Sequence, residues 1–466
     1  MSARIQRSRP AQDTTARAPS EIPPSQPSLP PAEPLLISDV SMAFSDSTVR
    51  LSWLTNFAAT AQEGYGTGGA PVLWGESGPA GVIHDAVIGG LAPSTEYVFW
   101  LQSVDDWGRV ATAELNVTTP SSESPRVSTA TVSGGSILLD AKPFFPLALW
   151  DVCPSQVSRL IDNGINPFMG DGCGDENALL ARLRGQTFAV TNGTNGMTLL
   201  PSLIGWYYPD ELDGRLGAPP SDADLKELAV DPPAGLLTFL TLTNHFYSGA
   251  EPLPLGRELY PHLAALANVL GFDLYPLQNW CRDDRFDAVY NAQRELEALG
   301  AGKPTYQWIE ARQMDCAAGN LDPTAATVRA ETWLAIAGGA DGIGYFPNNW
   351  SDTVGAEIRE LNSAIAELAP ALLSEPHQAD SNQDLVKVGA RVLNGAIYVI
   401  AVNSSRTPVQ ASIHVPGLGG RPLAVLDEER QLATSNDEIR TDIFDLLAVH
   451  IYVAAPPGWI TTSTTR

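Results

Sequence analysis

Between residues 145 and 346 the chain repeats one unit, in which a short apolar run is followed by a stretch of helical periodicity. The helical stretches include residues 156–162, 176–184, 285–299 and 325–336, and little helix follows the third apolar run. Buried strands are expected at residues 145–150, 165–170, 187–191, 203–208, 236–243, 271–275, 304–309 and 341–346. Eight strands joined by crossovers over about 240 residues predict a (β/α)8 TIM barrel.

Short alternating segments separated by turn residues predict β-structure on both sides of the barrel. The expected units are a β-sandwich at 35–120, the barrel at 126–375 and an antiparallel β-sandwich at 376–456 that caps the barrel. The first 34 residues are rich in Pro, Ser and Arg and predict a disordered leader, and residues 457–466 form a tail. A further helix is expected at 357–373.

The formal net charge of −25 argues against a nucleic-acid partner or an anionic membrane surface. It is compatible with a neutral or cationic substrate, or serves only to keep the protein in solution. No apolar run reaches the ~18 residues that a membrane-spanning helix needs. The start of the sequence also lacks the apolar segment of a secretory signal.

Two of the predicted strands end in acids. Residues 203–209 form an apolar, aromatic run that stops at Asp210 and Glu211, and residues 304–309 form a similar run that stops at Glu310. In a parallel β/α barrel the carboxyl ends of all strands face one catalytic mouth. Carboxyl groups set among tryptophans and tyrosines at such a mouth indicate glycoside-bond chemistry. A lone acid after a strand is more often a helix cap or part of a solvated loop.

The N-terminal unit resembles a fibronectin type III module. Trp53 lies on an early strand, residues 91–97 (LAPSTEY) match the tyrosine corner, and residues 105–108 (DDWG) match the turn before the last strand. The resemblance implies a spacer or binding module, not a catalyst. Residues 119–125 are the expected linker to the barrel.

The order of the acids resembles the large clan of retaining glycoside hydrolases on a TIM barrel. That resemblance implies that Glu211, after the fourth strand, is the acid/base and that Glu310, after the seventh, is the nucleophile. It also implies that Tyr275 orients Glu310 by a hydrogen bond, although from a neighbouring strand end. Many members of the clan place asparagine before the acid/base, whereas this chain has Asp210, which leaves open whether Asp210 shares the catalytic duty.

Sugar sites combine flat aromatic faces with polar groups that bind hydroxyls. Strand ends of this chain offer both, and Gln278 and Asn349 stand among them. The candidate substrate-binding residues are Trp150, Asp151, Asp171, Trp206, Tyr208, Asp210, Asn244, His245, Asp273, Tyr275, Trp280, Trp308, Arg312, Tyr345, Asn348 and Trp350. Most tryptophans in a protein of this size pack in the core, so each is a candidate only.

The four cysteines follow strands one, two, six and seven, on the same face of the expected barrel. Cys153 and Cys173 lie in adjacent loops, as do Cys281 and Cys316, so two disulfides are expected, with free buried thiols as the alternative. A metal site is disfavoured because no Cys-x-x-Cys or clustered histidine accompanies them. Disulfides would indicate an extracellular or cell-surface location, which conflicts with the absent signal.

The sequence thus predicts a glycosidase that cleaves O-glycosidic bonds of an oligo- or polysaccharide by a retaining double displacement, with no cofactor and no metal. The alternative is a non-catalytic carbohydrate-binding or adhesion protein on a barrel scaffold. A metallohydrolase is a poor third candidate because the chain has only six histidines and none in paired ligand spacing. The sugar, the linkage and the oligomeric state do not follow from the sequence.

Overall fold

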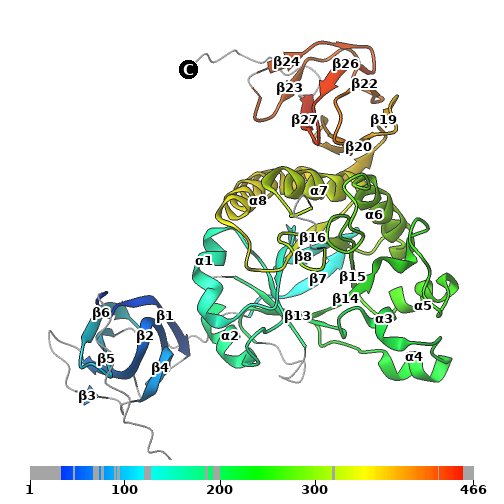
Figure 1. Cartoon of the computed structure of the whole chain (residues 1–466). Coiled ribbons are helices and arrows are strands. Elements are labelled where there is room, and N and C mark those ends of the chain that lie inside the picture. The colour runs from blue at the N-terminus through cyan, green and yellow to red at the C-terminus, as the bar shows by residue number, and fades with distance from the viewer. Residues whose placement is uncertain are drawn as a thin grey trace, which may run out of the picture.

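The computed structural model describes residues 33–45, 48–66, 73–74, 78–88, 91, 95–119, 127–183, 187–192, 200–316, 321–428 and 430–454. The predicted leader (except residues 33 and 34), nearly all of the linker and the tail lie outside the described residues. Three regions follow one another along the chain: an N-terminal β-module, a central barrel and a C-terminal β-domain (Figure 1).

The central region is a closed barrel of parallel strands in chain order, which confirms the predicted fold. Its strands are β10 (Leu147–Trp150), β11 (Phe168–Met169), β12 (Ala189–Thr191), β13 (Leu203–Tyr207), β14 (Leu237–Thr243), β15 (Val269–Asp273), β16 (Thr305–Glu310) and β17 (Gly342–Phe346). Every residue of β14 and β16 is buried, because helices cover the outside and side chains fill the inside. This explains why these strands read as apolar runs with little alternation.

The helices lie around the outside of the barrel. They are α1 (Val157–Asp162), α2 (Glu176–Leu183), α3 (Leu212–Leu216), α4 (Asp222–Leu228), α5 (Tyr260–Ala264), α6 (Asp287–Gly300), α7 (Ala325–Gly338) and α8 (Asp352–Leu372), with 3-10 turns η1 (Pro154–Gln156), η2 (Asn244–Phe246) and η3 (Arg257–Leu259). Helix α8 begins five residues before its predicted start. The reason is the cap: the Ser351 hydroxyl accepts a hydrogen bond from the backbone N–H of Val354 at 3.3 Å.

A small antiparallel sheet closes the amino end of the barrel. It consists of β7 (Ala130–Ser133), β8 (Ser136–Leu139) and β9 (Lys142–Phe144). Ile137 and Leu139 belong to the same buried cluster as Ala148, Ile204 and Phe239 inside the barrel. The carboxyl end is therefore the end left for a site, as expected for this fold.

The N-terminal module is a six-stranded antiparallel sheet of β1 (Ile37–Ser45), β2 (Thr48–Gly66), β3 (Leu73–Trp74), β4 (Gly78–Ile88), β5 (Glu96–Asp105) and β6 (Val110–Thr118). The long strand β2 pairs with β1, β4 and β5, so it connects most of the strands of the module. Trp53 is buried, as predicted, and its indole N–H donates to the Ser103 hydroxyl at 3.1 Å. The fibronectin type of the module stays a prediction.

The C-terminal domain has two antiparallel sheets that share one core, in agreement with the predicted sandwich. One sheet contains β18 (Glu375–His377), β20 (Val386–Leu393), β21 (Ala396–Asn403), β27 (Val449–Ala454), β23 (Leu423–Val425) and β24 (Arg430–Leu432). The other contains β19 (Asp380–Ser381), β22 (Val409–His414), β26 (Glu438–Phe444) and β25 (Thr434–Ser435).

The C-terminal domain packs against α7 and α8, and touches α6, on the outside of the barrel and not over one of its ends (Figure 1). Gly389 of β20 lies so close to α7 that an added Cβ would be 2.4 Å from the Ala337 carbonyl oxygen. The Tyr290 hydroxyl of α6 donates to the Val388 carbonyl at 3.0 Å. The domain therefore buttresses the helices behind β16 and leaves the mouth of the barrel open. Among the described helices, none is long and apolar enough to span a membrane.

Candidate active site

A cavity of about 240 Å³ lies at the carboxyl ends of the barrel strands. Its wall comes from the ends of β10, β13, β15, β16 and β17 and from the loops after β15 and β16. The residues that line it are Trp150, Asp210, Glu211, Asp273, Tyr275, Gln278, Asn279, Trp308, Met314, Asp315 and Phe346. The structure thus brings together seven of the residues that the sequence singled out: Trp150, Asp210, Glu211, Asp273, Tyr275, Gln278 and Trp308.

Asp210 and Glu211 form one side of the cavity, where β13 turns into α3. Glu211 adopts a left-handed backbone conformation, with φ of 50°, at the position before α3. Burial, followed by the nearby charge of Glu211, raises the pKa of Asp210 to about 6. Burial and the charge of Asp213 raise the pKa of Glu211, and Arg215 and His245 oppose this rise.

Asp213 fixes this turn from behind. Its carboxylate accepts hydrogen bonds from the Thr243 backbone N–H at 2.8 Å, the Thr243 hydroxyl at 2.5 Å and the Tyr260 hydroxyl at 2.8 Å. Asp213 is 1% exposed. It ties α3 to the end of β14 and so holds Asp210 and Glu211 in place.

Asp273, at the end of β15, supplies a third carboxyl to the cavity. Its Oδ2 accepts a hydrogen bond from the Tyr275 hydroxyl at 3.0 Å, and its Oδ1 has no hydrogen-bond partner among the described residues. Burial raises the pKa of Asp273 well above its ordinary value, and the negative charges of Asp210 and Glu211 raise it further. This environment favours the protonated form of the Asp273 carboxyl.

Aromatic rings form the remaining wall. Trp150 meets Tyr207 edge to face at 4.9 Å and Trp308 at 5.8 Å between ring centroids. Trp308 lies over the backbone of β17, where an added Cβ at Gly344 would approach its ring to 2.2 Å. Its indole N–H donates to the Thr241 hydroxyl at 3.3 Å. These contacts fix a flat apolar surface next to the three carboxyls.

Glu310 ends β16 as predicted, yet it is not among the residues that line the cavity. Its side chain is 0% exposed. The two carboxylate oxygens accept the backbone N–H groups of Leu277 and Gln278, each at 2.8 Å. Tyr275 donates to Asp273 and not to Glu310, unlike the arrangement that the resemblance implies.

The remaining predicted binding residues do not line this cavity. Tyr208 and Tyr345 are buried towards the helices, where their hydroxyls donate to the Leu266 carbonyl and the Asn362 side chain. Asn348 donates to the Asp151 carbonyl at 2.7 Å and so links β17 to β10. The other predicted residues that do not line the cavity are Asp151, Asp171, Trp206, Asn244, His245, Trp280, Arg312 and Trp350.

The cavity also contains residues that the sequence did not single out: Asn279, Met314, Asp315 and Phe346. Tyr207 contacts Trp150 in place of its predicted neighbours Trp206 and Tyr208. Tyr207 takes this position because the pairing of β12 with β13 is irregular. Ala189 pairs with Leu203, but the next residue, Val190, pairs with Gly205, so β13 has one extra residue there. The extra residue shifts the alternation, so Tyr207 packs with the inner cluster and Trp206 with the outer one.

Both predicted disulfide pairings are confirmed. Cys153 pairs with Cys173 and Cys281 with Cys316, with Cα–Cα distances of 5.2 and 5.6 Å. The second bridge joins the loops after β15 and β16, which both contribute to the cavity. Among the described residues, no group of three or more His, Cys, Asp or Glu side chains is arranged to hold a metal ion.

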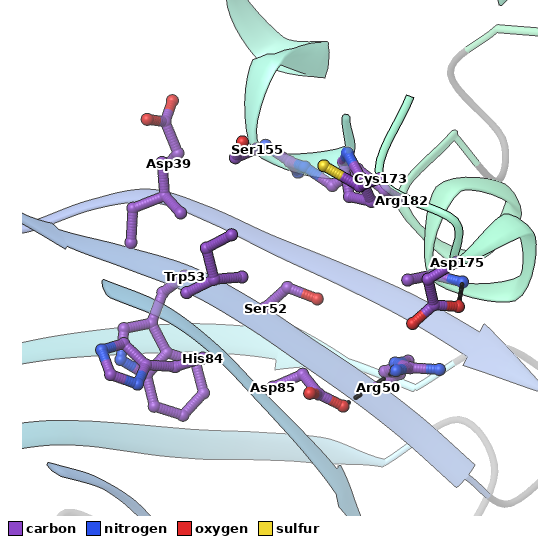
Figure 2. A pocket seen from close by; sticks show the side chains of 14 residues that line it. Asp39, Arg50, Ser52, Trp53, His84, Asp85, Ser155, Cys173, Asp175 and Arg182 are labelled. Atoms are coloured by element: carbon purple, nitrogen blue, oxygen red, sulfur yellow. Dashed lines mark hydrogen bonds and ion pairs between the residues drawn. The ribbon is translucent and has the colours of Figure 1, made fainter. Parts of the chain in front are cut away.

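A second cavity, of about 160 Å³, lies where the N-terminal module meets α2 and the loop after β10 (Figure 2). Arg50 and Asp85 of the module form an ion pair at 2.9 Å on one side of it. Cys173 and the buried Arg182 come from the barrel. The Arg182 guanidinium bonds to the Ser158 hydroxyl, so both Arg50 and Arg182 already have partners. We therefore interpret this cavity as a gap between two packed units and not as a binding site.

No family model and no curated protein matches this chain. Among solved structures, the β-glucuronidase of Ruminococcus gnavus aligns over 71% of this chain and 68% of its own, with 8% identity and a TM-score of 0.37. The same protein in complex with D-glucuronic acid aligns over 70% and 68%, with 8% identity and a TM-score of 0.36. Likeness at this level carries no argument about function.

Proposed function

We propose that this protein is a glycosidase that hydrolyses O-glycosidic bonds of an oligo- or polysaccharide. The observation that carries the proposal is the convergence of Asp210, Glu211 and Asp273 beside Trp150 and Trp308 in one cavity at the carboxyl end of a β/α barrel. Glycoside hydrolysis needs one carboxylic acid that gives a proton and one carboxylate that acts on the other side of the bond. Aromatic faces bind the C–H surfaces of sugar rings.

The environments of the three carboxyls favour different protonation states. Asp273 is shielded and faces two negative neighbours, so it holds a proton and acts as the general acid on the leaving oxygen. Burial and the charge of Asp213 raise the pKa of Glu211 as well, but Arg215 and His245 oppose that rise, so Glu211 ionises more readily than Asp273. It is the carboxylate that attacks the anomeric carbon or activates water. Asp210 raises the pKa of Asp273 by its charge.

This assignment departs from the sequence prediction at one residue. Glu310 was predicted as the nucleophile, but both of its oxygens accept backbone hydrogen bonds and it does not line the cavity, so it is not part of the proposed pair. The retaining mechanism stays a prediction. It requires carboxyls about 5–5.5 Å apart, whereas inversion requires about 6.5–9.5 Å. Proton NMR of the first-formed anomer distinguishes the two.

The proposed substrate is neutral or cationic. Four carboxyls line the cavity, at Asp210, Glu211, Asp273 and Asp315, and no Lys, Arg or His is among its described lining residues. A sugar carboxylate placed there would meet like charge without a cationic partner. The two disulfide-bonded pairs further support the proposal of an extracellular or cell-surface location.

The test is a screen of the purified protein against aryl glycosides and polysaccharides, followed by Glu211→Gln and Asp273→Asn variants. Activity that disappears in both variants, with unchanged melting temperature, supports the proposal. Saturable binding of oligosaccharides without hydrolysis by the wild type would instead favour the alternative of a non-catalytic carbohydrate-binding protein.

A further inference from the structure

Behind the cavity, two carboxyl groups are buried against each other. Glu310 of β16 and Glu331 of α7 are both 0% exposed, and their side chains are in contact. The oxygens of Glu331 receive no hydrogen bond from any N–H or O–H group of the described residues. Two buried carboxylates in contact would repel each other strongly. A single proton turns the contact into a hydrogen bond.

The hydrogen bonds around Glu310 determine which of the two carries that proton. Glu310 already accepts two backbone N–H groups, which favour its ionised form, so Glu331 is the donor. Burial raises the pKa of both groups, and the charge of Glu310 raises the pKa of Glu331 further. Arg406, in the turn after β21, opposes the rise in the pKa of Glu331, and the charge of Glu310 raises the pKa of the Tyr275 hydroxyl in the loop after β15.

The ionised Glu310 holds two loops at once. Through Leu277 and Gln278 it fixes the loop that follows β15. The Gln278 side chain then donates to the Leu321 carbonyl at 2.8 Å and accepts from the Met314 N–H at 2.6 Å, both in the segment after β16. Gln278, Asn279 and Met314 line the cavity. One carboxylate therefore anchors much of the cavity's rim from the buried side.

We propose that Glu310 and Glu331 share one proton and act together as positioning residues that hold the loops after β15 and β16 against the proposed glycosidase site. The inference rests on the proposed function for its kinetic consequences, but not for its structural ones. In this arrangement Glu310 touches no substrate, and Glu331 keeps Glu310 ionised and fully bonded.

Two isosteric variants separate this role from catalysis. In Glu310→Gln the side chain has one acceptor oxygen for two N–H groups, so one hydrogen bond to the loop is lost. Amide exchange in the peptide containing residues 277 and 278 should accelerate about tenfold, and kcat/KM should fall by up to about a hundredfold through misplacement of the rim. In Glu331→Gln the amide N–H still donates to Glu310, so exchange and kcat/KM near neutral pH should match the wild type.

The pH dependence of stability gives a second readout. The raised pKa of Glu331 means that its protonated form contributes stability at low pH, and that this contribution is lost as pH rises from its ordinary 4.5 through the raised value. Glu331→Gln cannot ionise, so its melting temperature should fall less than that of the wild type between pH 5 and 9.

The outcomes are distinct. Loss of turnover in Glu310→Gln by about 10⁴-fold or more with unchanged amide exchange, together with partial rescue of a Glu310→Ala variant by azide or formate, identifies Glu310 as the nucleophile and overturns the inference. Unchanged exchange in Glu310→Gln together with an unchanged pH profile in Glu331→Gln also overturns it. If the wild type hydrolyses no glycoside, the proposed function fails, while exchange and melting still decide the role of the pair.

Discussion

The ends of β13 and β16 look alike in the sequence and differ in the folded protein. Each is an aromatic strand that stops at an acid, and each occupies the position expected from its order in the barrel. At β13 the acids Asp210 and Glu211 reach the cavity, while at β16 the acid Glu310 is enclosed by backbone amides and by Glu331.

The difference lies in the hydrogen bonds that the neighbouring loops offer each carboxyl. After β13, the buried Asp213 takes the structural hydrogen bonds of the turn, so its neighbours remain available to the cavity. At the end of β16, the loop after β15 presents two backbone N–H groups to Glu310. A carboxylate that accepts both hydrogen bonds is stabilised in this buried position. A strand-end acid can face the cavity where another group makes the structural hydrogen bonds of the turn.

The largest effect is expected from Asp273→Asn. If Asp273 is the general acid, kcat on glycosides with poor leaving groups should fall about 10²- to 10⁴-fold. Activity on activated aryl glycosides should fall much less, because their leaving groups need no proton. Steady-state kinetics on a leaving-group series measures this. Asp315→Asn, at another cavity acid, is the control and should stay close to wild type. Equal losses across the series would remove Asp273 from the acid role.

The two disulfides offer the next contrast. Replacing Cys281 and Cys316 by Ser, or Cys153 and Cys173 by Ser, should each cost about 2–4 kcal/mol in the free energy of unfolding. Only the first pair of substitutions should also lower kcat/KM, because that bridge joins the loops that Glu310 anchors. Denaturant melts and kinetics on both variants give the comparison. Equal kinetic losses would show that the loops after β15 and β16 have no special role.

Gly344→Ala tests the part of β16 that does serve the cavity. The added methyl would lie 2.2 Å from the Trp308 ring, so either the ring or the strand must move. Stability should decrease by about 1–3 kcal/mol, and KM should rise because the apolar wall shifts. Gly78→Ala, where the nearest atom is 3.7 Å away, is the matched control. An unchanged KM in Gly344→Ala would argue against a substrate contact at Trp308.

The smallest effect is expected from Asp210→Asn. The charge of Asp210, which forms above its pKa of about 6, raises the pKa of Asp273. Its removal should therefore lower the pKa of the proposed acid and move the alkaline limb of kcat/KM to lower pH by up to about one unit. A pH–rate profile measures the shift. A limb that moves to higher pH would contradict the assigned sign.

Much of the architecture follows from local patterns. The apolar runs identified all eight barrel strands because buried parallel strands leave a strong signal in sequence. The cysteine pairing followed as well, since once the strand order is known, adjacent loops on one face bring Cys281 near Cys316. The positions of Asp210, Glu211 and Asp273 at strand ends are consequences of the same order.

The direction in which each side chain points could not be predicted from local sequence patterns, because it depends on contacts between segments that are distant in the sequence. The irregular pairing of β12 and β13 turned Tyr207 inward in place of Trp206. Asp315 and Met314 reached the cavity on a loop with no sequence signature. Glu310 does not face the cavity because it bonds to backbone N–H groups that precede it by more than thirty residues. The sequence by itself determined the order of the strands and therefore which strand-end residues stand at the mouth of this barrel. The packing of the loops decided which of these residues, and which loop residues, face the cavity, because a buried carboxyl must satisfy its hydrogen bonds.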